Sequence, residues 1–272
     1  GYLSMKTDIP QVGVIHDLNF EHYPADLPTS ARKYLRTYFP KFAQKAADII
    51  TVSNYSANDI ATTYGIDKKK IHVAWNGVSE EFTPLDGAPT GELGKGAPYF
   101  LYVGALHPRK NIVRMLQAFD RFKEDGSATR LVITGEPYWV NKEMKATFDS
   151  LRHKEDVVFT GHLSQDKLVI AMREARALVY VSYFEGFGIP LVEAMRSGIP
   201  VIAANVTSLP EVGGEVPLFV DPFKVDEIQE AMHLIDNDPE LRREKRKQGI
   251  ERAQRFNWKH TADMCWKVIE QK

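Results

Sequence analysis

From residue 98 onward, short apolar runs alternate with stretches that have helical periodicity. This alternation is typical of βα units, which build a parallel sheet covered by helices. In the stretch 111–122 the apolar residues recur on one helix face, and Asn111 stands where an N-cap is expected. We therefore predict a complete Rossmann-like α/β domain with strands at 99–103, 130–134, 157–159, 177–181, 199–203 and 218–220.

The region before residue 84 has a weaker version of the same pattern. Strands are expected at 12–15, 49–52 and 71–74, with helices at 29–46 and 56–64, and Ser56 and Asp59 match a capping box for the second helix. Three strands make only a partial Rossmann-like domain, whose missing part we expect in a preceding segment or a second chain. We expect a first domain at 1–84, a glycine- and proline-rich linker at 85–98, a second domain at 99–255 and a helix at 256–272 that packs back on the first domain.

Composition narrows the class of protein. The 272 residues contain 35 lysines and arginines and 36 acids, so the near-neutral charge gives no reason to expect a nucleic-acid partner. Cys265 is the only cysteine, and no apolar run approaches the roughly 20 residues that cross a bilayer. We expect a cytoplasmic protein. The basic stretch 241–247 is interpreted as a solvated helix face, and it leaves peripheral contact with the inner membrane surface open.

The most informative string begins at Glu185 and continues as Gly-Phe-Gly-Ile-Pro-Leu-Val-Glu to Glu193. It follows a predicted strand, its glycines allow a tight turn, and Pro190 suits the first turn of a helix. A helix N-terminus formed in this way attracts phosphate through its free N–H groups. The two glutamates supply acceptors for sugar hydroxyls, although a plain glycine turn with a helix acid would explain either one alone.

This string is similar to the E-x7-E motif of family 4 glycosyltransferases, which have the GT-B fold of two Rossmann-like domains facing a cleft. The resemblance runs from about residue 9 to the end. It implies that the first glutamate contacts the donor sugar, that the next amides approach sugar and diphosphate, and that the second glutamate holds the ribose. The matching donor-binding positions are Gly104, Gly161, His162, Leu163, Gly186, Phe187, Gly188, Ile189, Pro190, Leu191 and Glu193.

A second string, 102–111, places Arg109 and Lys110 after a predicted strand and at the start of a helix. Cations there oppose the helix dipole, so they predict a bound anion such as a diphosphate, although a solvated pair would also explain them. Fixed cations would stabilise the charge that a departing diphosphate gains. Lys110 fits the family pattern directly. The family often has an arginine directly after the glycine, where this chain has Ala105, so the arginine role falls on Arg109.

Other segments match the family less specifically. His16 and Asp17 follow the first predicted strand, and the resemblance places the histidine near the donor sugar. Residues 160–164 resemble the corner that binds the base, although Ser164 as a helix cap explains most of that segment. Weaker matches at strand ends or turns are Gly135, Glu136, Ser53, Asn54 and 76–78.

We expect no metal and no other cofactor. Asp236-Asn237-Asp238 has the Asp-x-Asp form that holds a metal in other glycosyltransferases, but its place before Pro239 favours a helix boundary. The histidines show no metal-ligand spacing.

The resemblance implies a retaining glycosyltransferase in polysaccharide biosynthesis, with Glu185, Arg109, Lys110 and His16 as catalytic residues. The donor is a GDP- or UDP-linked sugar, and GDP-mannose is favoured because similar chains with a Pro-Arg-Lys-Asn segment are often described as mannosyltransferases. The acceptor is a glycan or a lipid-linked sugar. A non-catalytic nucleotide-sugar-binding fragment and a glycoside hydrolase using Glu185 and Glu193 are the alternatives. An epimerase or phosphorylase lacks a cofactor-lysine motif.

Overall fold

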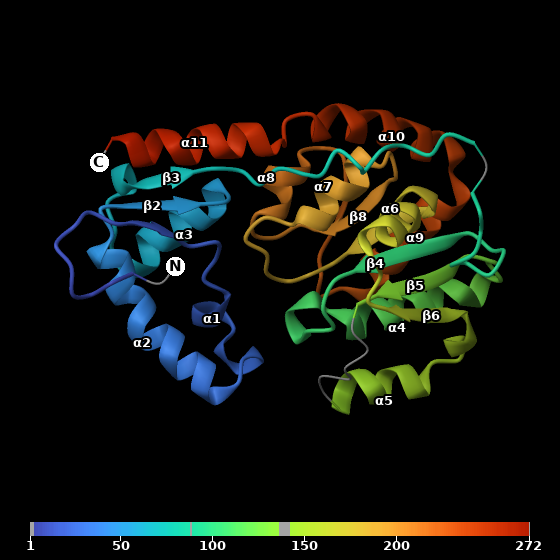
Figure 1. Cartoon of the computed structure of the whole chain (residues 1–272). Helices are drawn as coiled ribbons and strands as arrows, with labels where there is room; N and C mark the ends of the chain where they lie inside the picture. The colour runs from blue at the N-terminus through green and yellow to red at the C-terminus, as the bar shows by residue number, and fades with distance from the viewer. Residues whose placement is uncertain (1–2, 88, 136–141, 272) are drawn as a thin grey trace.

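The structure is a computed structural model that describes residues 3–87, 89–135 and 142–271. Two parallel sheets lie side by side, the smaller one built by the blue-to-teal part of the chain and the larger one by the part that follows it (Figure 1). The predicted α/β architecture is confirmed. The predicted Glu136 lies outside the described residues.

The smaller sheet has the strand order β1-β2-β3 among the described residues, and all neighbours are parallel. Helices α2 and α3 cover one face with a core that includes Ile49 and Ile60. On the other face Val268 of α11 (Trp258–Glu270) packs against Ile50 and Ala74. The elements of this part are β1 (Val12–Val14), α1 (Asn19–His22), η1 (Pro24–Asp26), α2 (Thr29–Lys45), β2 (Asp48–Thr51), α3 (Asn54–Tyr64), η2 (Lys68–Lys70) and β3 (Ile71–Val73).

The start of α3 differs from the predicted capping box. The helix begins at Asn54, and the side chain of Ser53 accepts the hydrogen bond from the backbone N–H of Ser56. Ser53 has extended backbone, the conformation in which an N-cap oxygen reaches the first turn. The capping box at Ser56 and Asp59 is therefore wrong, and Asp59 instead pairs with His22 at 2.8 Å.

The larger sheet has the parallel order β6-β5-β4-β7-β8-β9. Its elements are β4 (Tyr99–Val103), η3 (Pro108–Lys110), α4 (Ile112–Phe122), η4 (Lys123–Asp125), β5 (Arg130–Thr134), α5 (Lys142–Ser150), η5 (Lys154–Asp156), β6 (Val157–Gly161), α6 (Gln165–Glu174), β7 (Ala177–Tyr180), α7 (Ile189–Arg196), β8 (Val201–Ala204), α8 (Leu209–Gly213), β9 (Leu218–Val220), α9 (Val225–Asn237), α10 (Pro239–Ala253) and α11 (Trp258–Glu270).

Strand β4 is buried on both sides, as expected for the centre of a doubly wound sheet. Tyr99 and Leu101 face the core formed with α6 and α7, whereas Phe100 and Tyr102 face the core formed with α4 and α9. The order of the strands reverses between β4 and β7. Such a switch point leaves a crevice outside the carboxyl ends of the strands, where open α/β sheets bind ligands.

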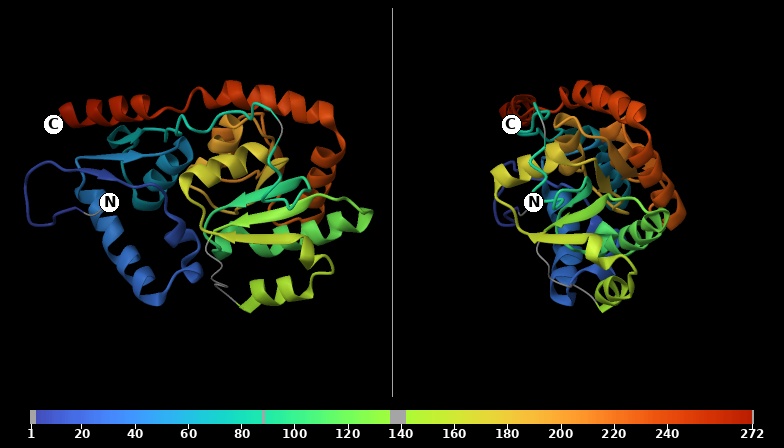
Figure 2. Two further views of the ribbon diagram at one scale, coloured as in Figure 1. Left: turned by 45° about the vertical axis from the view of Figure 1, so that its right-hand side comes forward. Right: turned by 90° about the vertical axis from the view of Figure 1, so that its right-hand side faces the viewer.

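The chain passes between the two sheets twice (Figure 2). The first crossing is the segment 74–98, whose described residues form no helix or strand. The second follows α10, so that α11 runs back along the smaller sheet. The crossings touch each other, because a β-carbon on Gly77 would lie 2.3 Å from the backbone nitrogen of Trp258. Thr261 also donates a 2.6 Å hydrogen bond to the carbonyl of Trp75.

Helix α10 contains the basic stretch 241–247. Arg243 and Lys247 are exposed, as a solvated face requires, but Arg242 and Arg246 are half-buried, so that interpretation is only partly correct. Among the described helices, none combines the length and the apolar composition needed to cross a bilayer.

Candidate functional site

The loop after β4 carries the predicted cations. Gly104 has a φ of 144°, and a β-carbon there would lie 3.0 Å from the hydroxyl of Tyr102. Arg109 and Lys110 lie in the short turn η3, just ahead of α4. Asn111 precedes α4, but its side-chain oxygen accepts from Arg114 and makes no capping hydrogen bond. Its amide nitrogen donates to the carbonyls of Val181 and Pro222.

Glu185 joins this loop to the one after β7. Its side chain is 7% exposed, and one carboxylate oxygen lies 2.5 Å from Nζ of Lys110 while the other lies 2.9 Å from Arg109. The anion that these cations were expected to need is therefore supplied by the protein itself. Burial alone would raise the pKa of Glu185, but the charges of Lys110 and Arg109 outweigh it and hold the pKa below its usual value.

Lys110 and Arg109 have further fixed partners. Nζ of Lys110 donates to the hydroxyl of Tyr180 at 2.9 Å, and Arg109 donates to the carbonyl of Phe184 at 2.9 Å. Both cations are thus held at the switch point between β4 and β7. Sequence reasoning found the three charged residues but not Tyr180, which looked like an ordinary strand residue.

Gly186 is where the second domain touches the first. A β-carbon there would lie 2.7 Å from the carbonyl oxygen of His16 and 2.8 Å from Cβ of Asp17. On its other side, the hydroxyl of Ser53 donates to the Gly186 carbonyl at 2.7 Å. The predicted His16 therefore lies beside the Glu185 loop, with its side chain exposed.

Asp17 also belongs to this site, although we predicted no role for it beyond its place next to His16. Burial raises its pKa, and the charges of Arg109 and Glu185 act on it in opposite directions. One of its oxygens accepts from the backbone N–H of Asn19 at 3.0 Å. The domain contact that buries Asp17 depends on the packing of distant segments, so the local sequence could not reveal it.

Helix α7 begins after Gly188, whose φ is 99°. Pro190 lies in its first turn, as predicted. The side chains of Phe187 and Leu191 are buried, at 4% and 0% exposed, so Phe187 can offer a ligand only its backbone. Glu193 is partly buried, and burial raises its pKa to about 7.

A pocket of about 520 Å³ lies at the carboxyl ends of β4, β5 and β6. It brings the predicted Gly104 together with His162 and Leu163, while Gly161 accepts a hydrogen bond from the backbone N–H of Gly135 beside it. The remaining lining residues, which sequence reasoning missed except for Gly135, are Val103, Ala105, Leu106, His107, Thr134, Gly135 and Leu168. A mostly apolar slot beside the buried cations suits a flat ring joined to a charged group.

The rim between the two domains is aromatic and was not predicted. The hydroxyl of Tyr183 donates to Asp26 at 2.5 Å, and the ring of Phe184 stacks on His22 with the centroids 5.3 Å apart. Tyr55 contacts Phe184 edge-on at 6.0 Å. These contacts close one side of the Glu185 loop.

Glu211 of α8 forms a second bridge between the domains. Its carboxylate accepts hydrogen bonds from the backbone N–H groups of Asn54 at 2.8 Å and Tyr55 at 3.0 Å, at the N-terminus of α3. It also accepts from the indole of Trp75 at 2.9 Å. A carboxylate is favourable at a helix N-terminus, so Glu211 fixes how α3 meets the larger domain.

The Asp-x-Asp segment lies at a helix boundary, as predicted. Asp238 caps α10 by accepting from the N–H of Leu241 at 2.9 Å, and Asp236 pairs with Arg176 at 3.2 Å. No group of three or more histidine, cysteine or acidic side chains suited to a metal was found in the part of the chain that the structure describes.

Two family models match most of the chain. The family model of "Glycosyl transferases group 1" matches residues 89–255, and that of "Glycosyltransferase Family 4" matches residues 1–82. Similar curated proteins are O-antigen chain mannosyltransferase B of Escherichia coli (29% identical over 92% of this chain), the O-antigen chain mannosyltransferase RfbU of Salmonella typhimurium (30%, 85%) and the MMP alpha-(1->4)-mannosyltransferase of Mycolicibacterium hassiacum (30%, 85%). The chain spans 67%, 62% and 55% of their lengths.

Solved structures share the fold. Sucrose-phosphate synthase from Thermosynechococcus elongatus matches with a TM-score of 0.80 at 21% identity, over 98% of this chain and 68% of that one. Anabaena HepE in complex with UDP-glucose matches with a TM-score of 0.80 at 19% identity, over 96% and 71%. The predicted GT-B architecture is confirmed.

Proposed function

Because this chain belongs to the group 1 glycosyl transferases, we propose that it forms the donor site of a retaining enzyme that transfers mannose from GDP-mannose to a glycan or lipid-linked acceptor without a metal. The observation that carries the proposal is the buried cluster of Glu185, Arg109 and Lys110 at the switch point, between the apolar pocket and His16.

The cluster suits the departure of a diphosphate. Lys110 has three N–H donors and uses two on Glu185 and Tyr180, so one remains for a phosphate oxygen. Arg109 binds Glu185 and Phe184 through one terminal nitrogen, which leaves the N–H groups of the other nitrogens. Because Glu185 holds both cations in place, they need little rearrangement when the leaving group gains charge.

The proposed step keeps the anomeric configuration. The bond from the anomeric carbon to the phosphate oxygen breaks, and a bond to the acceptor oxygen forms on the same face. The acceptor proton leaves on the diphosphate. Both oxygens of Glu185 are engaged by cations, so this carboxylate is not placed as a nucleophile. Without Glu185 as a nucleophile, the proposed transition state has oxocarbenium character.

The choice of donor rests on separate support. The three similar curated proteins are named as mannosyltransferases, and two of them act on O-antigen chains by name, which supports mannose and polysaccharide synthesis. The guanine base is our proposal, with the pocket beside His162 and Leu163 as its site. Glu193 would accept hydrogen bonds from the ribose.

A glycoside hydrolase is disfavoured by the same cluster. That reaction needs two available carboxyl groups flanking the sugar. Glu185 is buried and paired with two cations, and a hydrolase gives no role to Arg109 and Lys110.

Calorimetric titration of the chain with GDP-mannose, GDP, UDP-glucose and UDP, with and without EDTA, tests the proposal. GDP-mannose is expected to bind in either condition. The Arg109→Ala variant should bind at least tenfold more weakly, because a charge-assisted hydrogen bond contributes about 1.5–3 kcal/mol. Arg121, exposed and paired with Asp226, provides the matched control Arg121→Ala.

Each part of the proposal would be rejected by a different result. Loss of binding in EDTA would reject metal independence, and binding of UDP-glucose alone would reject the choice of donor. Equal weakening by Arg109→Ala and Arg121→Ala would reject the site. The configuration of the product, read by NMR, decides between retention and inversion.

A further inference from the structure

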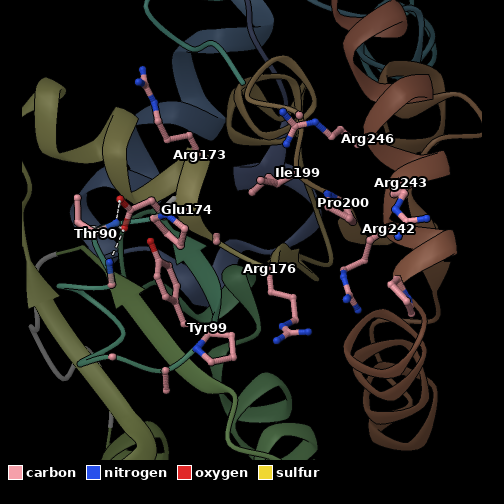
Figure 3. Close-up of a pocket in the computed structure, with 18 residues that line it drawn as sticks. Thr90, Tyr99, Arg173, Glu174, Arg176, Ile199, Pro200, Arg242, Arg243 and Arg246 are labelled. Carbon is pink, nitrogen blue, oxygen red and sulfur yellow. Dashed lines mark hydrogen bonds between the residues drawn. The ribbon is translucent and has the colours of Figure 1, made fainter. Parts of the chain in front are cut away.

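A second cavity, of about 730 Å³, lies at the amino ends of the strands of the larger sheet, opposite the candidate donor site at their carboxyl ends. Its lining includes Pro98, Arg176 and Pro200, each of which shortly precedes a strand. Because all strands of this sheet are parallel, their amino ends lie on the same side of the sheet. Figure 3 shows the cavity between the end of α6, the starts of the strands and α10.

The cavity is strongly basic. Its charged lining residues are Arg173, Arg176, Arg242, Arg243, Arg246 and Glu174. The single carboxylate is already engaged, since Glu174 accepts hydrogen bonds from the backbone and side chain of Thr90 at 2.7 and 3.1 Å. Five arginines therefore line the cavity with one acid, and the guanidinium of Arg173 donates to the carbonyl of Glu81 and the hydroxyl of Thr83.

Two of the arginines are neutralised by acids outside the cavity. Arg176 pairs with Asp236 at 3.2 Å, and Arg243 pairs with Glu240 one helical turn away. These pairs leave a net positive charge, because the other three arginines have no carboxylate within ion-pair distance among the described residues.

Arg242 and Arg246 are held by neutral carbonyls. Arg242 donates to the carbonyl of Ile235 at 2.6 Å and to that of Asp236 at 2.9 Å, and Arg246 donates to Leu85 at 3.4 Å. A guanidinium has five N–H donors, so most donors of both groups have no acceptor among the residues that the structure describes. Burial lowers the pKa of Arg242, and the charge of Arg176 lowers it further. The charges of Asp236 and Asp238 act in the opposite direction but do not outweigh these two effects. A half-buried positive charge of this kind is stabilised by an anion.

We propose that this cavity binds a small molecule bearing a phosphate monoester or diphosphate group. Guanidinium groups match phosphate oxygens in paired hydrogen bonds. The volume lies within the range of about 300–1,000 Å³ that small-molecule sites occupy. The concave shape favours a small molecule over a flat bilayer. The proposal does not depend on the nature of the donor, because no lining residue is shared with the donor pocket.

The cavity also lies beside the end of the first crossing and the first turns of α10, the helix that precedes the second crossing. Thr90, Gly91 and Ala97 of the linker form one wall, and α10, which leads into the second crossing, forms another. Arg246 already joins the two through its hydrogen bond to Leu85. A bound phosphate would therefore contact the end of the first crossing and the helix that leads into the second.

Calorimetric titration with inorganic pyrophosphate at fixed ionic strength tests the site. The probe is added to the native chain, to Arg109→Gln, and to the double variant Arg242→Gln/Arg246→Gln. Arg121→Gln/Arg152→Gln, two exposed arginines with carboxylate partners, is the matched control. We expect binding to persist in Arg109→Gln and in the control, and to weaken at least tenfold in the double variant.

A second variant tests the site even if the double arginine variant does not fold. Pro89→Glu places a carboxylate at the exposed wall of the cavity and removes no arginine, and it should weaken binding as well. The proposal is overturned if the native chain does not bind pyrophosphate, if binding is lost in Arg109→Gln, or if both cavity variants bind as the native chain does. A chain that sediments with phosphatidylglycerol vesicles but does not bind pyrophosphate would also overturn the proposal, in favour of a lipid surface.

Discussion

Replacing Glu193 with glutamine tests whether burial keeps this side chain neutral near pH 7. The pKa of Glu193 is raised from 4.5 to about 7, and burial is the cause. One pKa unit corresponds to about 1.4 kcal/mol, so the folded chain favours the protonated form over the ionised form by about 3 kcal/mol more than the unfolded chain does. Glutamine has nearly the same shape and no charge. The variant therefore removes the titration and keeps the packing.

The sign follows from the raised pKa. Protonated Glu193 contributes its full stabilisation below about pH 4.5, and this contribution is lost as the pH rises through about 7. The native chain should therefore lose about 3 kcal/mol of unfolding free energy from this group between about pH 4 and about pH 8.5. The Glu193→Gln variant should not, so its stability relative to the native chain should increase by that amount.

Urea unfolding at the two pH values measures this difference. Glu230→Gln on α9 is the matched control, since Glu230 is exposed, and its stability relative to the native chain should not change with pH. A Glu193→Gln variant whose relative stability is also the same at both pH values would refute the reasoning. A linked measurement concerns the ligand: if ionised Glu193 accepts ribose hydroxyls, nucleotide affinity should rise through pH 7 in the native chain only.

Three further changes have defined outcomes. Lys110→Ala leaves Glu185 buried with one cation fewer and should lower the free energy of unfolding in urea by about 3–5 kcal/mol. Adding Glu185→Gln should restore part of that free energy, and no restoration would argue against the ion pair. Glu211→Gln weakens the bridge to α3 and should lower the rate of transfer and shift indole fluorescence, while an unchanged rate would deny it a positioning role. Gly77→Ala should speed hydrogen exchange in α11, because its β-carbon would overlap Trp258, and unaltered exchange would contradict that contact.

The larger sheet was predictable because its strands are apolar on both faces. The predicted strands at 99–103, 130–134 and 218–220 coincide with β4, β5 and β9. The start of α3 was not predictable, because Ser53 and Ser56 both suit an N-cap. Only the extended backbone at Ser53 decides between them.

The candidate site was predictable in its members but not in its pairings. Glu185 and Lys110 are 75 positions apart, and their ion pair exists because β4 and β7 are neighbours in the sheet. The same limit applies to Arg242 and Arg246. Helix α10 is charged around its whole circumference, so periodicity gave no sign of which arginines are half-buried.

Two crossings between the same two bodies restrict how those bodies can move. A single flexible connection would allow rotation about any axis, whereas segment 74–98 and the link from α10 to α11 together favour rotation about the line through both. Gly186 and His16 meet at the domain contact rather than in either crossing, so rotation about that line would change their separation. The distance between their backbones is therefore a natural coordinate for opening and closing the site.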